Sequence, residues 1–173
     1  MRIWNIITES GSVIYYHGTP SNSLTPTITD MRPLSHFGSR QAAEHRILTK
    51  FLENKNLMGL RSASSMIAGT IFPVHIAMSN PLRIEDSRDN RMHGYPLVDH
   101  LHYDLHVLTS EDREKVFKSR CDPTAIVSML RSKGYDGLLY RNLVEDMGHD
   151  SVMIFSSDQV TPAGPPQRFF KTY

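Results

Sequence analysis

The sequence predicts a single compact domain of the mixed α+β class. Short strand-like segments are interleaved with only two or three helical ones, which is the pattern of that class, and the chain contains no internal repeat. A length of 173 residues is that of one ordinary domain, which buries roughly 70% of the surface of its unfolded chain. The hydrophobic fraction of 39% and the charged fraction of 21% are typical of a globular protein and exclude a disordered one.

Strand signals occur in four short segments: 13–16, 72–78, 138–140 and 152–155. In 72–78 apolar residues alternate with Pro73, His75 and Ala77, which predicts a half-buried strand. Because proline donates no backbone hydrogen bond, Pro73 predicts that this strand lies at a sheet edge or begins there.

The first helix is predicted over about 40–56. Ser39 is a suitable amino-terminal cap, and the helix is expected to stop before Gly59. Apolar residues share one face of this helix at Ala43, Ile47 and Phe51. Leu48 and Leu52 flank this face.

The second helix is predicted over 122–133. Asp122 is a good cap, Pro123 suits the first helical position, and Gly134 suits a left-handed exit. Its apolar residues recur at helical spacing, so one face is expected to pack in the core.

Two regions lack a clear pattern. Residues 85–95 read as a polar loop and 98–118 as an ambiguous segment with a weak helical pattern, so 85–118 is interpreted as an insertion. Residues 161–173 contain three prolines and a glycine and are predicted to be a flexible tail, which limits the folded domain to 1–160.

The composition excludes several classes of protein. Lys plus Arg number 19 against 18 for Asp plus Glu, a net charge of +1, so binding to nucleic acid is not expected. Cys121 is the one cysteine, which excludes an intrachain disulfide and a thiolate zinc site. No apolar run reaches the ~18 residues of a membrane span, and residues 1–7 are too short for a signal peptide. We therefore expect a cytoplasmic protein that has no membrane partner. We also expect the protein to be a monomer.

The common catalytic and nucleotide-binding motifs are missing. The sequence has no GxxxxGK[ST] loop, no GxGxxG after a strand and no GxSxG elbow. A metal site built from His102, His106 and either Asp99 or Asp104 was weighed, because histidines four residues apart share a helix face. There is no HExxH pattern to support it, and no metal is predicted.

Three separated segments remain as functional candidates. The first is Tyr-Tyr-His-Gly-Thr-Pro at 15–20, where a glycine lets a ligand approach the backbone, although a surface turn is the simpler interpretation. The second is His-Phe-Gly-Ser at 36–39, where rings precede a helix start that favours anionic groups; here the alternative is a core phenylalanine beside a surface histidine.

The third segment is 134–155, in which two strands flank a polar loop. Asp136 with Gly137 is interpreted as a structural turn. The loop carboxylates either face a cleft or belong to a solvated hairpin; they are Glu145, Asp146 and Asp150.

The order of these segments, followed by Val-Met-Ile-Phe and then Gln159-Val160, resembles the ADP-ribosyltransferase superfamily over residues 15–160. The resemblance is greatest to the branch found in phage and other mobile-element (polyvalent) proteins, and more distant to the poly-ADP-ribose polymerase catalytic core. It implies a split mixed β-sheet with a few flanking helices, and NAD as co-substrate.

The resemblance also implies roles for individual residues. His17 would bind the adenosine ribose, the Gly18 backbone would hold the nicotinamide carboxamide, and Thr19 would lie beside them. His36 stands where relatives have a tyrosine beneath the nicotinamide, so its charge would vary with pH. The other residues expected to frame the ligand are Phe37, Gly38 and Ser39.

Relatives also have a glutamate that stabilises the positive charge developing on the ribose. In the polymerase-like branch this glutamate directly precedes the apolar residues of the last strand, a position held here by Ser151. Other branches place the acid on the preceding loop, which favours Glu145, with Asp146 and Asp150 as alternatives.

The sequence therefore predicts an NAD-dependent mono-ADP-ribosyltransferase acting on a macromolecular acceptor, expected to be a protein. The resemblance implies a phage or bacterial effector, or toxin, in the cytoplasm of a bacterial host. The alternatives are an NAD glycohydrolase, an inactive module that binds NAD or a protein, and, ranked lower, an RNA 2′-phosphotransferase.

Overall fold

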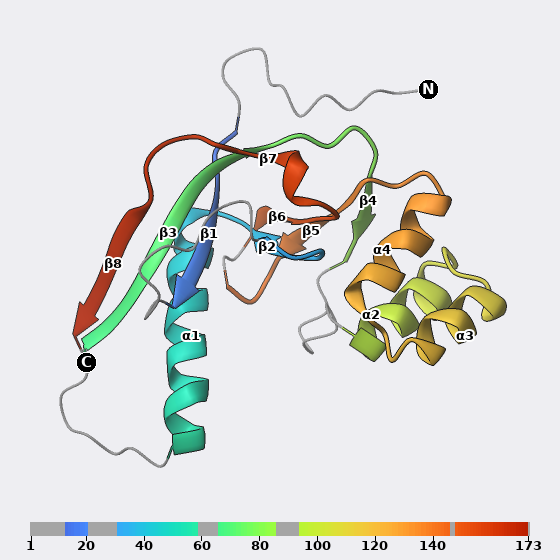
Figure 1. Cartoon of the computed structure of the whole chain (residues 1–173), viewed down its shortest axis with the longest axis horizontal. Helices are drawn as coiled ribbons and strands as arrows, with labels where there is room; N and C mark the ends of the chain where they lie inside the picture. The colour runs from blue at the N-terminus through green and yellow to red at the C-terminus, as the bar shows by residue number, and fades with distance from the viewer. Residues whose placement is uncertain (1–12, 21–30, 59–65, 86–93, 146–147, 173) are drawn as a thin grey trace.

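The computed structural model of the protein has two four-stranded sheets. The longest of the described strands, β3 (Met66–Ile76), is the central strand of one of them. The structure describes residues 13–20, 31–58, 66–85, 94–145 and 148–172. One edge of β3 pairs antiparallel with β1 (Tyr15–Pro20), and the other pairs with β7 (Val160–Pro162) and β8 (Gln167–Thr172) (Figure 1).

The second sheet has the strand order β2-β6-β5-β4. Its strands are β2 (His36–Phe37), β6 (His149–Ile154), β5 (Gly137–Asn142) and β4 (Pro81–Ile84). Only the β4–β5 pair is parallel among these described strands. The two sheets meet where Tyr16 N donates to Gly38 O at 2.8 Å and Gly38 N donates to Tyr16 O at 3.1 Å. This seam brings β1 and β2 side by side, and with them two of the candidate motifs.

Helix α1 (Arg40–Met58) is the first helix that the sequence predicted, and it lies against β1 and β3 (Figure 1). Ser39 Oγ accepts a hydrogen bond from Ala42 N at 3.2 Å, so Ser39 is the amino-terminal cap. Ala43 and Ile47 are buried in a cluster with residues of β3. The expected start and apolar face are confirmed; Gly59 lies outside the described residues.

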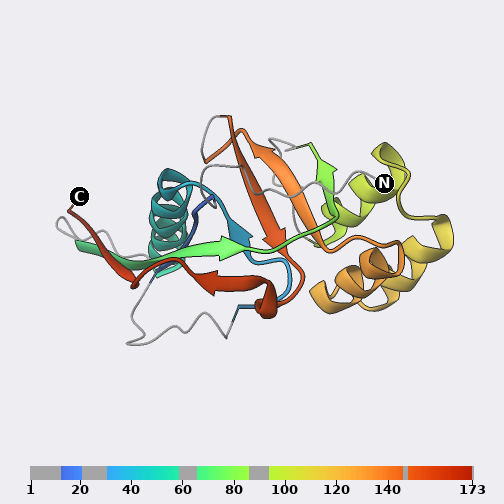
Figure 2. The ribbon, with the colours of Figure 1, turned by 90° about the horizontal axis from the view of Figure 1, so that it is seen from above.

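Three further helices form a helical lobe at the opposite end of the molecule from α1 (Figure 2). They are α2 (Gly94–Asp99), which continues into a π-helical segment (His100–Asp104), α3 (Ser110–Lys118) and α4 (Pro123–Ser132). Leu97, Leu101 and Val116 share one core cluster with Leu130 of α4 and Leu138 of β5. The described part of the segment expected to be an insertion is therefore packed into the main core, although 86–93 lie outside the described residues.

Helix α4 confirms the second predicted helix. The Asp122 carboxylate accepts hydrogen bonds from Thr124 N at 3.1 Å and Ala125 N at 3.2 Å, which satisfies two amides of the first turn. Gly134 follows the helix with a φ of 89°, a left-handed conformation that glycine adopts without strain.

Two strand predictions need correction. The first strand was expected over 13–16, but β1 begins at Tyr15 and continues through the His-Gly motif to Pro20, so the motif is not a surface turn. Pro73 was expected at an edge or a strand start, but it lies inside β3. Its nitrogen points away from β1, because Tyr16 opposite it bonds to Gly38 instead. On the opposite edge, β3 pairs with β8 up to Ile71 and with β7 from Val74, so Pro73 lies between the two paired stretches. The missing N–H of Pro73 therefore removes no hydrogen bond between strands.

The tail prediction is wrong. Residues 167–172 form β8, which pairs with β3 over six positions, and β7 pairs with β3 over three. Arg40 Nη1 of α1 also donates to Gln167 Oε1 of β8. Of the residues that indicated flexibility, Pro162 ends β7, and Gly164, Pro165 and Pro166 lie in the short connection to β8. The long edge of β3 supplies hydrogen bonds that the tail sequence alone did not reveal.

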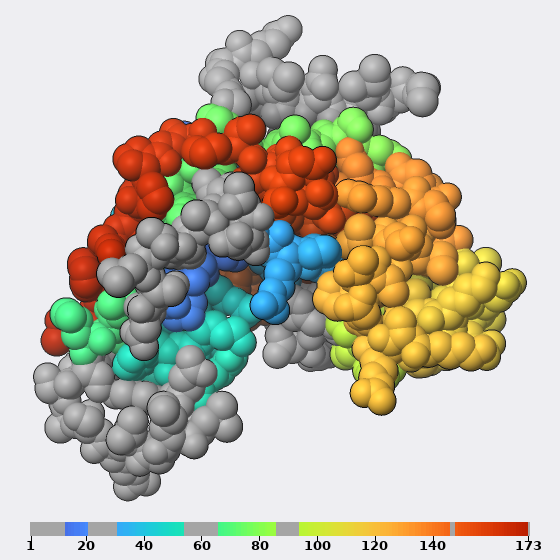
Figure 3. All heavy atoms as spheres, in the orientation of Figure 1, coloured from blue at the N-terminus to red at the C-terminus, as the bar shows by residue number. Residues whose placement is uncertain are grey.

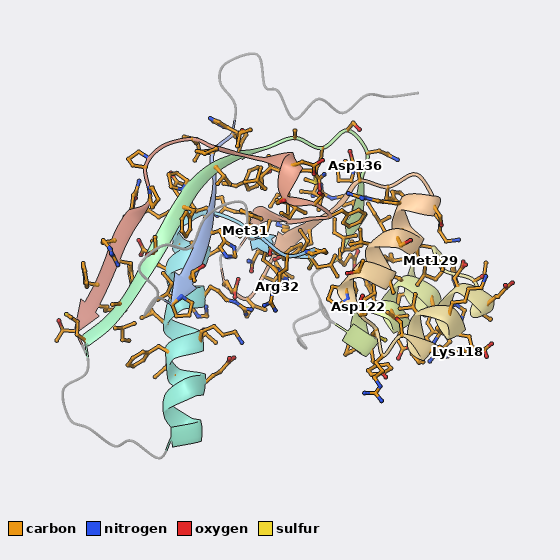
Figure 4. All side chains as sticks on the ribbon, viewed as in Figure 1. Met31, Arg32, Lys118, Asp122, Met129 and Asp136 are labelled. Carbon is orange, nitrogen blue, oxygen red and sulfur yellow. The ribbon has the colours of Figure 1, made fainter. Side chains whose placement is uncertain are left out.

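Asp136 has a structural role, but not in the turn that the sequence predicted for Asp136 and Gly137, because Gly137 is already the first residue of β5. Its carboxylate accepts from Ser79 Oγ at 2.8 Å and from Asn80 N at 2.9 Å, tying the β3–β4 connection to the start of β5. Its carbonyl oxygen accepts from Gln159 Nε2 at 2.7 Å, while Gln159 Oε1 accepts from Phe155 N at 2.8 Å. Figure 4 shows Asp136 at the junction of these connections, far from α1.

Gly18 packs without clearance against α1, which yields a stability prediction. A Cβ atom at Gly18 would overlap the backbone carbonyl of Ala43, which cannot move without shifting the helix. We expect Gly18→Ala to lower the free energy of unfolding by roughly 1–3 kcal/mol, the usual cost of overpacking. Urea denaturation followed by circular dichroism measures it.

Gly164→Ala is the matched control. A Cβ at Gly164 would meet Pro73 Cγ at 3.6 Å, an ordinary contact, so its stability should stay within about 0.5 kcal/mol of wild type. Equal stability of the two variants would contradict the close packing of β1 on α1.

Candidate active site

A cleft of about 810 Å³ lies where α1, the seam between the sheets and the helical lobe meet. In Figure 3 the light-blue atoms around β2 lie between the cyan atoms of α1 and the orange atoms of α4. Residues from all three candidate segments line this cleft, although they are far apart in the sequence; they include His17, Gly18, His36, Phe37, Gly38 and Glu145. The fold therefore brings the three motifs together at one place.

The half-buried ring of His17 is held in one orientation. Its Nδ1 lies 2.7 Å from the backbone oxygen of His36, which only accepts, so Nδ1 carries the proton. The ring also contacts the Phe37 ring, with centroids 5.1 Å apart. Burial, and to a smaller degree the charge of Arg46, lower the pKa of His17 below its ordinary 6.5, against the opposing effect of the bond to His36. His17 is thus a neutral imidazole near pH 7, and Nε2 is its hydrogen-bond acceptor.

Gly18 presents its backbone to the cleft. Tyr16 bonds through its N–H and C=O to Gly38, and neighbouring residues of a strand point these groups to opposite edges. The N–H and C=O of Gly18 therefore point to the same edge as those of Tyr16, which is the cleft side. The packing of α1 on Gly18 is an independent reason for a glycine here, so this residue type alone does not indicate a ligand.

His36 lines the cleft and its Nδ1 lies 2.8 Å from the hydroxyl of Tyr140 on β5. The two rings meet edge to face, with centroids 5.9 Å apart. Phe37, expected to frame a ligand, is about 1% exposed and belongs to the core cluster of β1, β3 and β6. Its ring contacts His17 from the core side, so Phe37 supports the cleft wall mainly by packing.

Of the other candidates from the first two segments, one lines the cleft and two do not. Gly38 lines the cleft, where an added Cβ would come within 2.6 Å of Ser151 Oγ. Ser39 caps α1, and Thr19 lies on β1 opposite Thr70; neither is among the lining residues.

Glu145 lies in the loop between β5 and β6 and lines the cleft, half-buried. Its Oε2 accepts from Asn142 Nδ2 at 3.4 Å and its backbone N–H donates to Asn142 Oδ1 at 2.8 Å. Asp150, by contrast, is exposed and paired with Arg83 at 3.2 Å, outside the lining residues. Asp146 lies outside the described residues. Of the two acids that the structure describes, Glu145 is the one at the cleft.

A basic stripe on α1, which the sequence reasoning missed, forms one wall of the cleft. The polar residues of α1 that line the cleft recur at three- and four-residue spacing along one helix face, and they are His45, Arg46, Thr49, Lys50 and Glu53, so the acid Glu53 offsets part of the positive charge of Arg46 and Lys50. Lys50 also pairs with Glu53 one turn later. Arg32, labelled near the middle of Figure 4, adds a further positive charge to the lining. The sequence shows that the predicted helix has a polar face with basic residues, but only the fold shows that this face borders a cleft.

The histidine-rich stretch of the helical lobe has internal partners. His100 Nδ1 lies 2.7 Å from Asp104 Oδ2, and His102 Nδ1 lies 2.7 Å from the backbone oxygen of Leu108. Within the described ranges, no three His, Cys, Asp or Glu residues are arranged to hold a metal ion. Burial raises the pKa of the Cys121 thiol, which opposes a nucleophilic role. None of the helices in the described part of the chain has the length and apolar character needed to cross a membrane.

Comparisons with known proteins return no match. No family model fits the chain, and no curated protein and no solved structure is significantly similar to it.

The pKa of His17 yields a prediction on stability. Because folding lowers this pKa, the unfolded chain binds a proton that the folded chain does not, between the folded value and about 6.5. The contribution of His17 to the free energy of unfolding is fully present above pH 6.5 and is lost as the pH falls toward the pKa of His17 in the folded state. Each unit of lowering corresponds to about 1.4 kcal/mol. Urea denaturation between pH 7.5 and 5 should show this loss for wild type and a smaller one for His17→Gln.

His75→Gln is the control, since His75 lies on β3 and is not a lining residue. Identical pH dependence for wild type and His17→Gln would show that His17 is not held neutral by the fold.

Proposed function

We propose that the protein is a mono-ADP-ribosyltransferase that transfers ADP-ribose from NAD to a macromolecular acceptor, most simply a protein. The observation that supports this proposal is the convergence of His17, His36 and Glu145 on one cleft. These residues come from β1, β2 and the β5–β6 loop, and the motif resemblance names the same three segments. Convergence of residues 128 positions apart in the chain is not expected of three unrelated surface turns.

The adenosine end and the nicotinamide end of NAD each find a suitable partner. A neutral His17 offers Nε2 to a ribose hydroxyl, because Nδ1–H already donates to the His36 carbonyl. The Gly18 N–H and C=O on the cleft edge of β1 match the C=O and NH2 of a carboxamide, as a strand would. The volume of about 810 Å³ is within the usual range for a ligand site.

The basic stripe supplies the charge that a dinucleotide needs. Arg46 and Lys50 lie one helical turn apart on the cleft wall, and Arg46 is close enough to His17 to influence its titration. A diphosphate between the two nucleoside halves would therefore meet arginine and lysine side chains, whose hydrogen bonds to phosphate are strong and charge-assisted.

Glu145 is the residue to which we assign the catalytic carboxylate. In the transfer, the bond between the ribose C1′ and the nicotinamide nitrogen breaks, and nicotinamide leaves with the electron pair. An acceptor nucleophile then bonds to C1′ and releases its proton to a base or to water. A carboxylate beside the ribose stabilises the positive charge that develops on the sugar and orients the acceptor. His36, fixed by Tyr140, borders the same region.

The setting and the acceptor belong to the same proposal. The motif order resembles the phage and mobile-element branch, so the acceptor would be part of the machinery of a bacterial host. The net charge of +1 does not favour nucleic acid as the acceptor. Hydrolysis of NAD differs only in using water as the acceptor.

Glu145→Gln provides the principal test. Purified protein is incubated with NAD labelled in the adenylate and with a bacterial lysate. We expect label on a discrete lysate protein with wild type, and a loss of at least about a hundredfold with Glu145→Gln, because the neutral amide cannot stabilise the transition-state charge. Binding of NAD, measured by calorimetry, should remain.

Asp150→Asn is the matched control, since it removes an exposed carboxylate of the same hairpin that does not line the cleft. Free nicotinamide without labelled protein would indicate a glycohydrolase. Absence of NAD consumption in several lysates would reject an enzyme and leave an NAD- or protein-binding module.

The basic stripe yields a separate prediction. Arg46→Ala should raise KM for NAD by about tenfold or more, the usual effect of losing a hydrogen bond to a charged group, with a smaller change in kcat. The effect should weaken at high salt, which screens the diphosphate. Arg131→Ala, on the exposed side of α4, is the control. An unchanged KM would show that the stripe does not hold the diphosphate.

A further inference from the structure

We propose that Asn142 is a positioning residue that holds the Glu145 carboxylate at the cleft. This inference rests on the proposed function, because it concerns how that reaction obtains its carboxylate. Asn142 is the last residue of β5 and lines the cleft, although only about 2% of its surface is exposed.

Both ends of the Asn142 amide have hydrogen-bonding partners. Oδ1 accepts from the backbone N–H groups of Val144 at 3.2 Å and Glu145 at 2.8 Å. Nδ2 donates to Ser151 Oγ at 3.2 Å and to Glu145 Oε2 at 3.4 Å. Each end of the amide thus contacts Glu145, one through its backbone and one through its carboxylate.

The backbone of Asn142 also binds the far end of the loop between β5 and β6. Its carbonyl oxygen accepts from Gly148 N at 3.0 Å. The loop that bears Glu145 is therefore tied at its start and at its end to one buried residue, which fixes the Glu145 backbone, and the Asn142 Nδ2 bond then holds the carboxylate itself.

The position of Ser151 bears on why the Glu145 carboxylate has to be held in place by another residue. It occupies the strand position at which polymerase-like relatives carry their glutamate, but its hydroxyl lies where even a Cβ on Gly38 would not fit. Gly38 and Ser151 are therefore closely packed, and the carboxylate that we assign to the reaction comes from the loop. A carboxylate on a loop loses side-chain and backbone entropy on ordering, and Asn142 offsets that cost in the folded state.

Asn142→Asp separates the two functions of the amide. Aspartate keeps an oxygen that accepts from the Val144 and Glu145 amides, but replaces the donor to Glu145 with a second carboxylate oxygen that repels it. We expect kcat to fall by about 10- to 100-fold, the range for a hydrogen bond to a charged group, with KM for NAD within about twofold of wild type. Asn142→Ala should lose both functions.

A double-mutant cycle distinguishes positioning from general damage. If Asn142 acts through Glu145, Asn142→Asp should cost little further kcat when Glu145 is already Gln. Hydrogen exchange supplies a readout independent of turnover: the Glu145 amide should stay protected in Asn142→Asp and lose protection in Asn142→Ala. Asn80→Asp is the control, because the Asn80 side chain donates to Gly134 O in a turn that is not part of the cleft.

The outcomes separate this inference from the proposed function. A wild-type protein that turns NAD over, with Asn142→Asp equally active or additive with Glu145→Gln, would overturn the positioning role alone. A wild-type protein that never consumes NAD would overturn the proposed function and this inference together. Loss of kcat that disappears in the Glu145→Gln background would support both.

Discussion

The backbone of Gly18 lies directly on the backbone of Ala43, with no room between β1 and α1 for even a methyl group. This contact brings the basic face of α1 beside His17, and the seam of β1 with Gly38 then brings His36 to the same place. Gly38 is similarly confined by Ser151 of β6. The cleft therefore depends on two glycines: Gly18 lets α1 approach β1 at backbone distance, and Gly38 leaves room for the side chains of Ser151 and Ala42.

The two halves of the fold supply different chemistry to the cleft. The half containing β1 and α1 contributes a neutral imidazole, a strand edge and the side chains of Arg46 and Lys50. The half containing β5 and β6 contributes a carboxylate held by a buried amide. Because the halves join at the seam, the carboxylate meets the opposite wall only when both sheets are formed.

The carboxyl-terminal strands and the helical lobe stabilise this arrangement from outside. β8 covers the edge of β3 and is linked to the start of α1 through Gln167 and Arg40. The helical lobe shares its apolar core with β4 and β5, and its Gly94, Pro123 and Ile126 reach the cleft lining. Both regions therefore belong to the folded unit that forms the site.

The sequence by itself determined the features whose signals lie within a few residues. Ser39 and Asp122 cap the predicted helices, and the acidic loop lies between two strands, because each depends on local hydrogen bonds and periodicity. The tertiary structure decided what depends on distant partners. It placed Pro73 inside a sheet, paired the tail with β3, buried Phe37, and turned Glu145 to the cleft and Asp150 away from it. Those outcomes follow from strand pairing and packing between segments tens of residues apart, which no local pattern encodes.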